Sequence, residues 1–96
     1  MILHASCIAH RERGLLILGP SGAGKSTLAL QMMALGAVLV ADDRTVLRRE
    51  GVRILADAPD SIRGRIEARG VGILHARAHG PVEVALAVDL ARPEPD

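Results

Sequence analysis

A glycine-rich segment, GPSGAGKS at residues 19–26, constrains the fold of this chain more than any other feature. The apolar residues 15–18 directly before it predict a buried strand, and residues 27–33 after it have the pattern of a helix. The segment matches the phosphate-loop pattern G-x-x-x-x-G-K-[ST], and its flanks supply the strand and the helix that this pattern requires. The sequence therefore predicts an α/β nucleotide-binding domain with a phosphate loop, a mixed β-sheet and few helices.

The residue types of this segment suit a polyphosphate. Glycines let backbone N–H groups approach phosphate oxygens, and the following helix adds the positive end of its dipole. Lys25 is the only lysine of the chain; its charge can reach the β- and γ-phosphates, and the Ser26 hydroxyl can ligate Mg²⁺. The alternative is a glycine-rich turn with an incidental lysine. We predict that nucleotide phosphates contact Gly19, Pro20, Ser21, Gly22, Ala23, Gly24, Lys25, Ser26 and Thr27.

Length and composition restrict the class of protein. Ninety-six residues allow one small domain, either a minimal phosphate-loop protein or an incomplete one. Phe, Tyr and Trp are absent, so no aromatic ring can stack on a base, and we expect weak base selectivity. The formal net charge of +1 without a basic tract argues against nucleic-acid or membrane partners. A single cysteine, no signal peptide and no apolar run of ~18 residues favour a cytoplasmic protein.

The rest of the pattern predicts mostly strands. A hairpin is expected over residues 2–18, with Gly14 helping to close its loop, and a second hairpin around Glu50 and Gly51. The first helix is expected from about Lys25 to Leu35, ending at Gly36. Strands are expected at residues 2–9, 15–18, 37–41 (a central strand), 45–49, 52–55, 71–74 and 82–90, a short helix at 62–66, and a proline-rich tail at 92–96 after a catalytic domain at 1–91.

Two aspartates, Asp42 and Asp43, end the apolar run at residues 37–41. A buried strand fixes such carboxylates at the edge of a sheet, close to the phosphate loop if the two strands are neighbours. One carboxylate can hold Mg²⁺, and the other can accept a proton from an attacking hydroxyl. The alternative is a solvated Asp-Asp turn at a strand end.

Three further side chains have both a functional and a structural interpretation. His4 on the first strand can orient or deprotonate an acidic partner, or it can be purely structural. Glu67 and Arg69 precede two glycines, and they suit either a Mg²⁺ ligand with an anion-binding arginine or an exposed salt-bridged turn. A zinc site formed by His4, Cys7 and His10 is not expected, because strand alternation places residue 7 on the opposite face.

These elements occur in one order that resembles the catalytic domain of HPr kinase/phosphorylase, the bacterial enzyme that acts on a serine of the phosphocarrier protein HPr. The resemblance runs from His4 to about Leu90, and its His, Asp-Asp and Glu-x-Arg-Gly-x-Gly elements are more specific than the phosphate loop. It rests on His4 and on residues 19–26, 40–44, 58–59 and 67–73.

The resemblance implies catalytic roles. Lys25 is catalytic, and Asp43 accepts the proton of the serine hydroxyl, or donates it when inorganic phosphate attacks phosphoserine. Asp42 supports Asp43, and His4 tunes this acidic site. Ser26 would bind Mg²⁺ with Glu67 as a second ligand. The implied cofactors are therefore ATP and Mg²⁺, and the implied assembly is a homo-oligomer, a hexamer in the family.

The sequence departs from the family pattern at both ends. It matches a shorter form without the amino-terminal domain, and it stops before a downstream stretch that carries another active-site arginine and a segment linked to dephosphorylation. We therefore expect a serine kinase, with the phosphorylase reaction less expected. Two alternatives are a catalytically incompetent nucleotide-binding regulatory fragment and a small-molecule phosphate-loop kinase.

Overall fold

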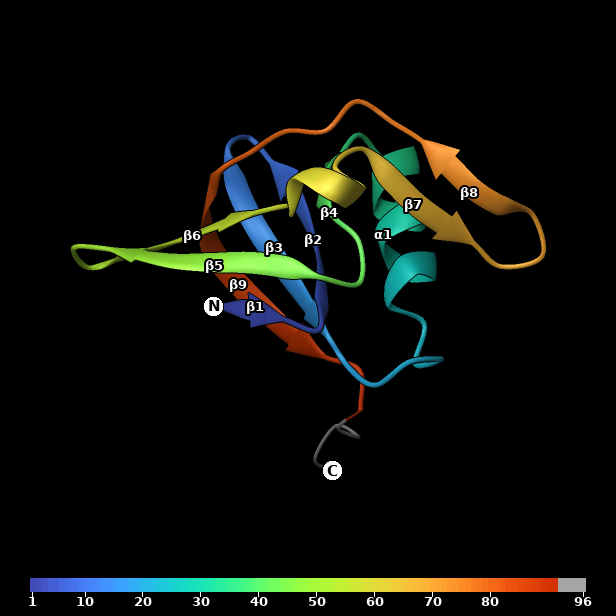
Figure 1. The fold of residues 1–96 in the computed structure, drawn as a ribbon, viewed down its shortest axis with the longest axis horizontal. Coiled ribbons are helices and arrows are strands. Elements are labelled where there is room, and N and C mark those ends of the chain that lie inside the picture. Colours follow the sequence, from blue (N-terminus) through green and yellow to red (C-terminus); the bar gives the residue numbers. More distant parts are fainter. Residues whose placement is uncertain (92–96) are drawn as a thin grey trace.

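The computed structural model describes residues 1–91, shown in Figure 1. Within this range the chain forms one α-helix, a short 3-10 helix and nine strands. The elements in chain order are β1 (Ile2–Leu3), β2 (Ala5–His10), β3 (Arg13–Leu18), α1 (Lys25–Ala34), β4 (Val38–Ala41), β5 (Thr45–Glu50), β6 (Arg53–Asp57), η1 (Asp60–Ile62), β7 (Arg65–Ala68), β8 (Gly72–His75) and β9 (Val82–Asp89).

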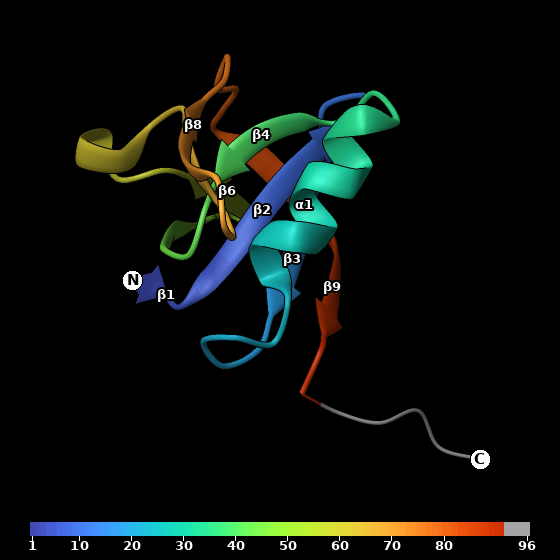
Figure 2. The same cartoon turned by 90° about the vertical axis from the view of Figure 1, so that its right-hand side faces the viewer.

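Seven of these strands form one sheet in the order β1-β5-β6-β9-β3-β2-β4, and β7 and β8 form a separate hairpin. The β3–β9 pair is parallel, whereas the other neighbouring pairs are antiparallel, so the sheet is mixed. Figure 2 shows α1 lying along β2 and β3 on one face of the sheet. The predicted fold class, an α/β domain with a mixed sheet and few helices, is confirmed.

The position of β2 brings its own start and the ends of β3 and β4 together at one edge of the sheet, where these strands begin or end. Because β2 is antiparallel to both β3 and β4, its N-terminal end lies beside the C-terminal ends of those two strands. β4 is the last strand in the order, so the prediction of a central strand at residues 37–41 is wrong. Its apolar character has another cause, since a bridge from Leu39 to Ala78 and the amide of His79 cover its outer side.

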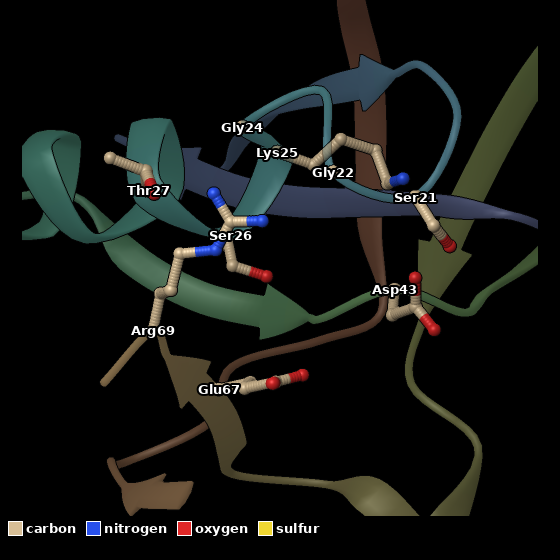
Figure 3. Close-up of a pocket in the computed structure, with 9 residues that line it drawn as sticks. All are labelled: Ser21, Gly22, Gly24, Lys25, Ser26, Thr27, Asp43, Glu67 and Arg69. Carbon is tan, nitrogen blue, oxygen red and sulfur yellow. The ribbon is translucent and has the colours of Figure 1, made fainter. Parts of the chain in front are cut away.

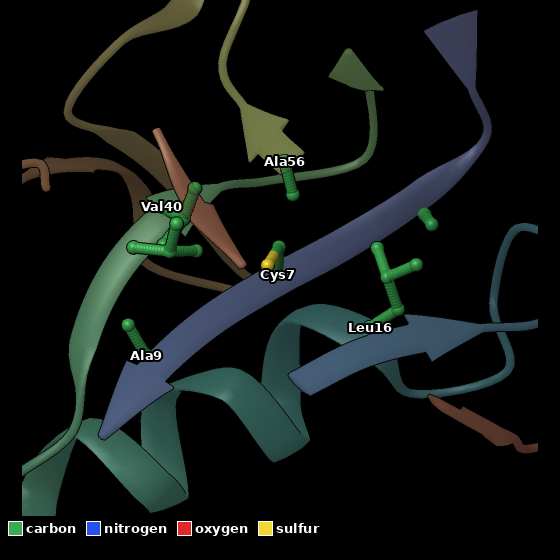
Figure 4. Close-up of a cluster of buried hydrophobic side chains, with 7 residues drawn as sticks. Cys7, Ala9, Leu16, Val40 and Ala56 are labelled. Carbon is green, nitrogen blue, oxygen red and sulfur yellow. The ribbon is translucent and has the colours of Figure 1, made fainter. Parts of the chain in front are cut away.

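Small aliphatic side chains fill the core on both faces of the sheet. β2 alternates between the two faces, with Cys7 in one buried cluster and Ile8 in the other. Figure 4 shows the first cluster, where Cys7 lies close to the side chains of neighbouring strands. Burial raises the pKa of the Cys7 thiol to about 12, so this cysteine remains a protonated core residue.

The first hairpin closes differently from the prediction. Arg11 and Glu12 form its two-residue turn, with φ values of 51° and 65°, and His10 pairs with Arg13. Gly14 lies within β3, where a Cβ atom would stand 2.9 Å from Cγ2 of Val82. The role expected for Gly14 in the loop is therefore wrong; a glycine here allows β9 to approach β3.

The first predicted strand is interrupted at His4. Residues 2–3 pair with β5 in the second hairpin, and the chain then bends so that β2 pairs with β3 and β4. The second hairpin is present, but its turn is Gly51–Val52 because Glu50 already pairs with Arg53. The bend at His4 joins the two parts of the sheet next to the end of β4.

The segment after β6 does not form the predicted helix at residues 62–66. It makes the single 3-10 turn η1 and then enters β7. Gly64 has a φ of 78°, and its carbonyl accepts a hydrogen bond from the amide of Ala76 at 2.7 Å. This contact extends the β7–β8 pairing at the open end of the hairpin, beyond the pair of Arg65 and His75.

The C-terminal end of α1 follows the prediction. Gly36 has a φ of 108°, and the amides of Gly36 and Ala37 donate to the carbonyls of Met33 and Met32. This pattern is the Schellman motif, which ends a helix at a glycine. The final predicted strand is present as β9, and the proposed tail at residues 92–96 lies outside the described residues. Within residues 1–91, no helix has the length and apolarity needed to span a membrane.

Candidate functional site

Residues 19–24 form the loop that joins β3 to α1 at the edge where the three segments meet. Gly19, Gly22 and Gly24 have φ values of 147°, 85° and 100°, in the range that glycine adopts far more easily than other residues. The amide of Ala23 donates to the Pro20 carbonyl at 3.0 Å and tightens the turn. Gly24 is the N-cap of α1 without a capping side chain, so unpaired N–H groups of the first turn lie beside the loop.

Lys25 begins α1, and its side chain folds back along the loop. Its ammonium group donates to the carbonyls of Gly19 at 2.6 Å and Pro20 at 3.2 Å. Only 6% of the residue is exposed. The single lysine of the chain is thus held inside the curve of the glycine-rich loop, among the residues that were predicted to bind phosphates.

Asp42 connects the loop helix with two other elements. One carboxylate oxygen accepts hydrogen bonds from the hydroxyls of Ser26 at 2.6 Å and Ser6 at 2.9 Å, and the other accepts from the amide of Glu67 at 3.0 Å. These three donors are electrically neutral, and the residue is 7% exposed. The carboxylate is therefore fixed in place next to α1 by groups that leave its negative charge uncompensated.

Asp43 occupies the centre of a γ-turn. The amide of Arg44 donates to the Asp42 carbonyl at 2.7 Å, and Asp43 has a φ of 67°. Such a conformation is strained for a residue with a Cβ atom, and strain of this kind is concentrated at functional sites. The turn directs the Asp43 carboxylate outward, where one oxygen lies 2.6 Å from Nε2 of His4. Both side chains are about half exposed, at 54% and 51%.

A pocket of about 300 Å³ lies between the glycine-rich loop, the end of β4 and the β7–β8 hairpin. Figure 3 shows Glu67 and Arg69 on the hairpin side, across from the loop, with Asp43 at the border of the pocket. Its lining is mainly polar and consists of Ser21, Gly22, Gly24, Lys25, Ser26, Thr27, Asp43, Glu67 and Arg69.

The predicted site residues fall into two groups in the structure. Eight of the thirteen predicted residues line the pocket, whereas Asp42 lies behind Ser26 and His4 lies outside Asp43. The other three, Gly19, Pro20 and Ala23, belong to the loop but do not line the pocket. Asp42 and Asp43 approach the loop although β2 separates β4 from β3, because all three strands have an end at this edge. Cys7 is in the core and His10 is exposed at the far end of β2, so they do not join His4.

The oxygen donors beside the loop have the chemistry that Mg²⁺ prefers. The Ser26 hydroxyl and the carboxylates of Asp42 and Glu67 are hard oxygen ligands, and Mg²⁺ commonly takes one or two carboxylates together with waters and substrate phosphates. Among residues 1–91 no group of three or more His, Cys, Asp or Glu side chains is arranged to hold a metal ion. The three oxygen groups beside the loop would therefore supply only part of the ligand set of such a cation.

Ser6 is a site residue that the sequence-based reasoning missed. It lies in β2 with no exposed surface, and it bonds to both Asp42 and the backbone of Asp43. The available signal was a hydroxyl residue in an otherwise apolar strand, since a buried hydroxyl in a folded protein almost always has a hydrogen-bond partner.

The comparison with known proteins identifies the family. A family model described as HPr Serine kinase C-terminal domain matches residues 1–90. The chain belongs to this family. The resemblance inferred from His4, the loop, the aspartate pair and the Glu-x-Arg-Gly segment is therefore confirmed.

Individual relatives of this HPr serine kinase C-terminal domain agree with the assignment. HPr kinase/phosphorylase from Caldicellulosiruptor bescii is 41% identical over 75 residues, covering 77% of this chain and 24% of that protein. The protein of the same name from Caldanaerobacter subterraneus is 38% identical over 92 residues, which cover 92% of this chain and 30% of that protein. The chain thus spans less than one third of the length of these two relatives.

A solved structure, the Hpr(Ser) kinase/phosphatase from Coxiella burnetii, has the same fold. It superimposes with a TM-score of 0.85 at 28% sequence identity, covering 93% of this chain and 64% of that one. The mixed sheet with one helix therefore matches the corresponding part of an HPr kinase structure.

Proposed function

We propose that this HPr serine kinase C-terminal domain transfers the γ-phosphoryl group of ATP to a serine hydroxyl of HPr. The observation that carries the proposal is the position of two adjacent carboxylates. Asp42 bonds to the hydroxyl of Ser26 at the start of α1, and Asp43 stands at the border of the same pocket with its carboxylate directed outward. The first carboxylate thus lies directly behind the hydroxyl at the start of α1, and the second stands at the border of the pocket, where an approaching alcohol could reach it.

Nucleotide binding would use residues 19–27, with backbone N–H groups on the phosphates. Mg²⁺ would be held by Ser26, Asp42 and Glu67, and when bound it neutralises charge on the β- and γ-phosphates. Lys25 would exchange the carbonyls of Gly19 and Pro20 for phosphate oxygens, which are stronger acceptors because they are charged. Residues 1–91 would therefore act as one catalytic domain.

Phosphoryl transfer would use Asp43 as the proton acceptor. The serine oxygen of HPr bonds to the γ-phosphorus while the bond to the β–γ bridging oxygen breaks, and the serine proton passes to Asp43. His4 holds one Asp43 oxygen at 2.6 Å and so leaves the other for the substrate. In the phosphorylase reaction an oxygen of inorganic phosphate would bond to the phosphorus of phosphoserine while the bond to the serine oxygen breaks, which releases pyrophosphate, and a protonated Asp43 would give its proton to that serine oxygen.

A second candidate is a nucleotide-binding regulatory chain without transfer activity. It is supported by the contacts of Lys25, whose ammonium group is bound to the carbonyls of its own loop. A cytoplasmic location and a homo-oligomeric assembly, the hexamer of the family, belong to the kinase proposal as well.

The test uses the full chain with Mg²⁺, γ-labelled ATP and purified HPr. Label on a serine of HPr that disappears with Asp43→Ala supports the kinase. The matched control is Asp60→Ala, which removes a carboxylate that is 97% exposed and is bound to Arg63. ATP binding without label transfer supports the regulatory chain, and label on a small metabolite with HPr untouched supports a small-molecule kinase. Inorganic phosphate added to phospho-HPr tests the reverse reaction.

A further inference from the structure

The hydroxyl of Ser6 contacts both aspartates, and it does so in two opposite roles. It donates to the Asp42 carboxylate at 2.9 Å and accepts from the backbone amide of Asp43 at 3.1 Å. A serine hydroxyl has one proton, so donation to Asp42 fixes its rotation and leaves a lone pair for the Asp43 amide. Ser6 is completely buried. The Ser6 side chain thus links the carboxylate of Asp42 to the backbone of Asp43.

The conformation of Asp43 needs such a contact. A residue other than glycine with positive φ in a γ-turn is strained, and it persists only where the surrounding structure fixes it. The backbone amides of this turn donate two hydrogen bonds, one from Arg44 to the Asp42 carbonyl and one from Asp43 to Ser6. The first lies within the turn itself, so the second joins the turn to the sheet.

A second hydroxyl at the same junction shows what a purely structural contact looks like. Thr45 is also completely buried, and its Oγ1 donates to the carbonyl of Ala5 at 2.8 Å. That bond joins the same two segments of chain, residues 4–6 and 42–45, but its partner is a backbone carbonyl and not a carboxylate. Ser6 differs because both of its partners belong to the aspartate pair.

We propose that Ser6 is a positioning residue for phosphoryl transfer, which couples the placement of Asp42 at the phosphate loop to the placement of the proton acceptor Asp43. The proposal rests on the proposed function. Without the Ser6 hydroxyl, Asp42 keeps its bonds to Ser26 and to the Glu67 amide, so nucleotide binding persists. The Asp43 amide loses its bond to β2, so the contact with His4 alone holds the Asp43 carboxylate and the turn no longer fixes the direction of the proton acceptor.

The experiment compares Ser6→Ala with Thr45→Val in the full chain. Steady-state transfer to HPr should show a kcat that falls roughly 10- to 100-fold in Ser6→Ala, since a misplacement of about 1 Å costs that much, while the KM for ATP stays close to that of the wild type. Thr45→Val should lower thermal stability without this loss of kcat. Ser6→Cys, which retains a weaker donor, should lie between serine and alanine.

Amide hydrogen exchange provides a readout that needs no activity. The Asp43 amide should be protected in the wild type and in Thr45→Val, and it should exchange at least about 10-fold faster in Ser6→Ala. An unprotected Asp43 amide in the wild type overturns the inference even if no variant can be purified. Equal kcat values for Ser6→Ala and Thr45→Val also overturn it, while the kinase proposal stands. A wild-type chain that transfers no label defeats the proposed function, and the exchange rates then still decide whether Ser6 holds the turn.

Discussion

Two strands in this domain each have a carboxylate at their end beside a pocket, and the two pockets are of similar size. The negative charges of the two carboxylates are treated in opposite ways. At the end of β4, Asp42 is held by two hydroxyls and one amide beside a pocket of about 300 Å³. At the end of β6, Asp57 accepts two hydrogen bonds from the guanidinium of Arg63, at 2.6 and 3.3 Å, beside a pocket of about 280 Å³. Neutral donors position a carboxylate and leave its charge for a cation, whereas an arginine cancels that charge.

The ionisation of the β6 pair reflects this compensation. Burial by itself would raise the pKa of Asp57, but the hydrogen bond from Arg63 and the amide of Ala58 outweigh burial and hold this pKa below its ordinary value. The hydrogen bond to Asp57, followed by the one to Asp60, raises the pKa of Arg63. The pair is therefore an ion pair at neutral pH that fixes the turn into η1, and we assign it a structural role.

The largest expected effect is a loss of transfer activity on substitution at the end of β4 but not at the end of β6. Asp43→Asn should reduce transfer to HPr by about 10²- to 10⁴-fold, because an amide cannot accept the serine proton. Asp57→Asn should leave kcat close to the wild-type value once folding has been checked by circular dichroism. Comparable losses in both variants would show that the contrast between the two ends has no catalytic meaning.

An intermediate effect concerns the cation. Asp42→Asn keeps the size of the side chain but removes the charge beside Ser26, so the Mg²⁺ concentration needed for half-maximal ATP binding should rise roughly 10-fold or more. Calorimetric titration of ATP at a series of Mg²⁺ concentrations measures this shift. Asp60→Asn serves as the control, and an identical Mg²⁺ requirement in both variants contradicts a cation site at the end of β4.

The smallest effect is on stability at the other end. Arg63→Met should cost at most about 1 kcal/mol of unfolding free energy at neutral pH, because the guanidinium and the carboxylate are both partly exposed. Since the folded-state pKa of Asp57 is lowered, the pair stabilises the fold above the ordinary Asp value near 3.8, and this contribution is lost as the pH falls through the folded-state value.

Urea unfolding of wild type and Arg63→Met between neutral and acidic pH measures this dependence. The difference between the two proteins should shrink at low pH, and transfer to HPr should be unaffected. A difference that grows on acidification, or a large loss of transfer, would show that Arg63 does more than fix a turn.

The sequence predicted the features that depend on local pattern. The strand–loop–helix unit follows from apolar residues on both sides of glycines, and the helix end follows from Gly36, whose positive φ suits that residue. The hairpin at residues 45–57 was also visible, because a glycine separates two runs of strand-forming residues. In each case the cause lies within a few residues of the effect.

Features that depend on distant partners were not predictable in this way. The bend at His4 results from the pairing of β1 with β5, more than forty residues along the chain. A helix was predicted at residues 62–66, but residues 65–68 form β7, which pairs with β8 and has the Gly64–Ala76 contact at its end. The placement of Asp42 and Asp43 depends on β2 being antiparallel to two strands, and Ser6 acquires its role only from that placement.

The most direct test of the central claim is to locate a divalent cation that is bound together with ATP. Mn²⁺ can replace Mg²⁺ and broadens the NMR signals of nearby amides, so it reports the site without requiring transfer. The account predicts selective broadening at Ser6, Ser26, Asp43 and Glu67 in the wild type, and weaker broadening at the same Mn²⁺ concentration in Asp42→Asn. Broadening centred on Asp57 and Asp60, or an unchanged pattern in Asp42→Asn, would contradict the claim that the glycine-rich loop and the end of β4 form one site.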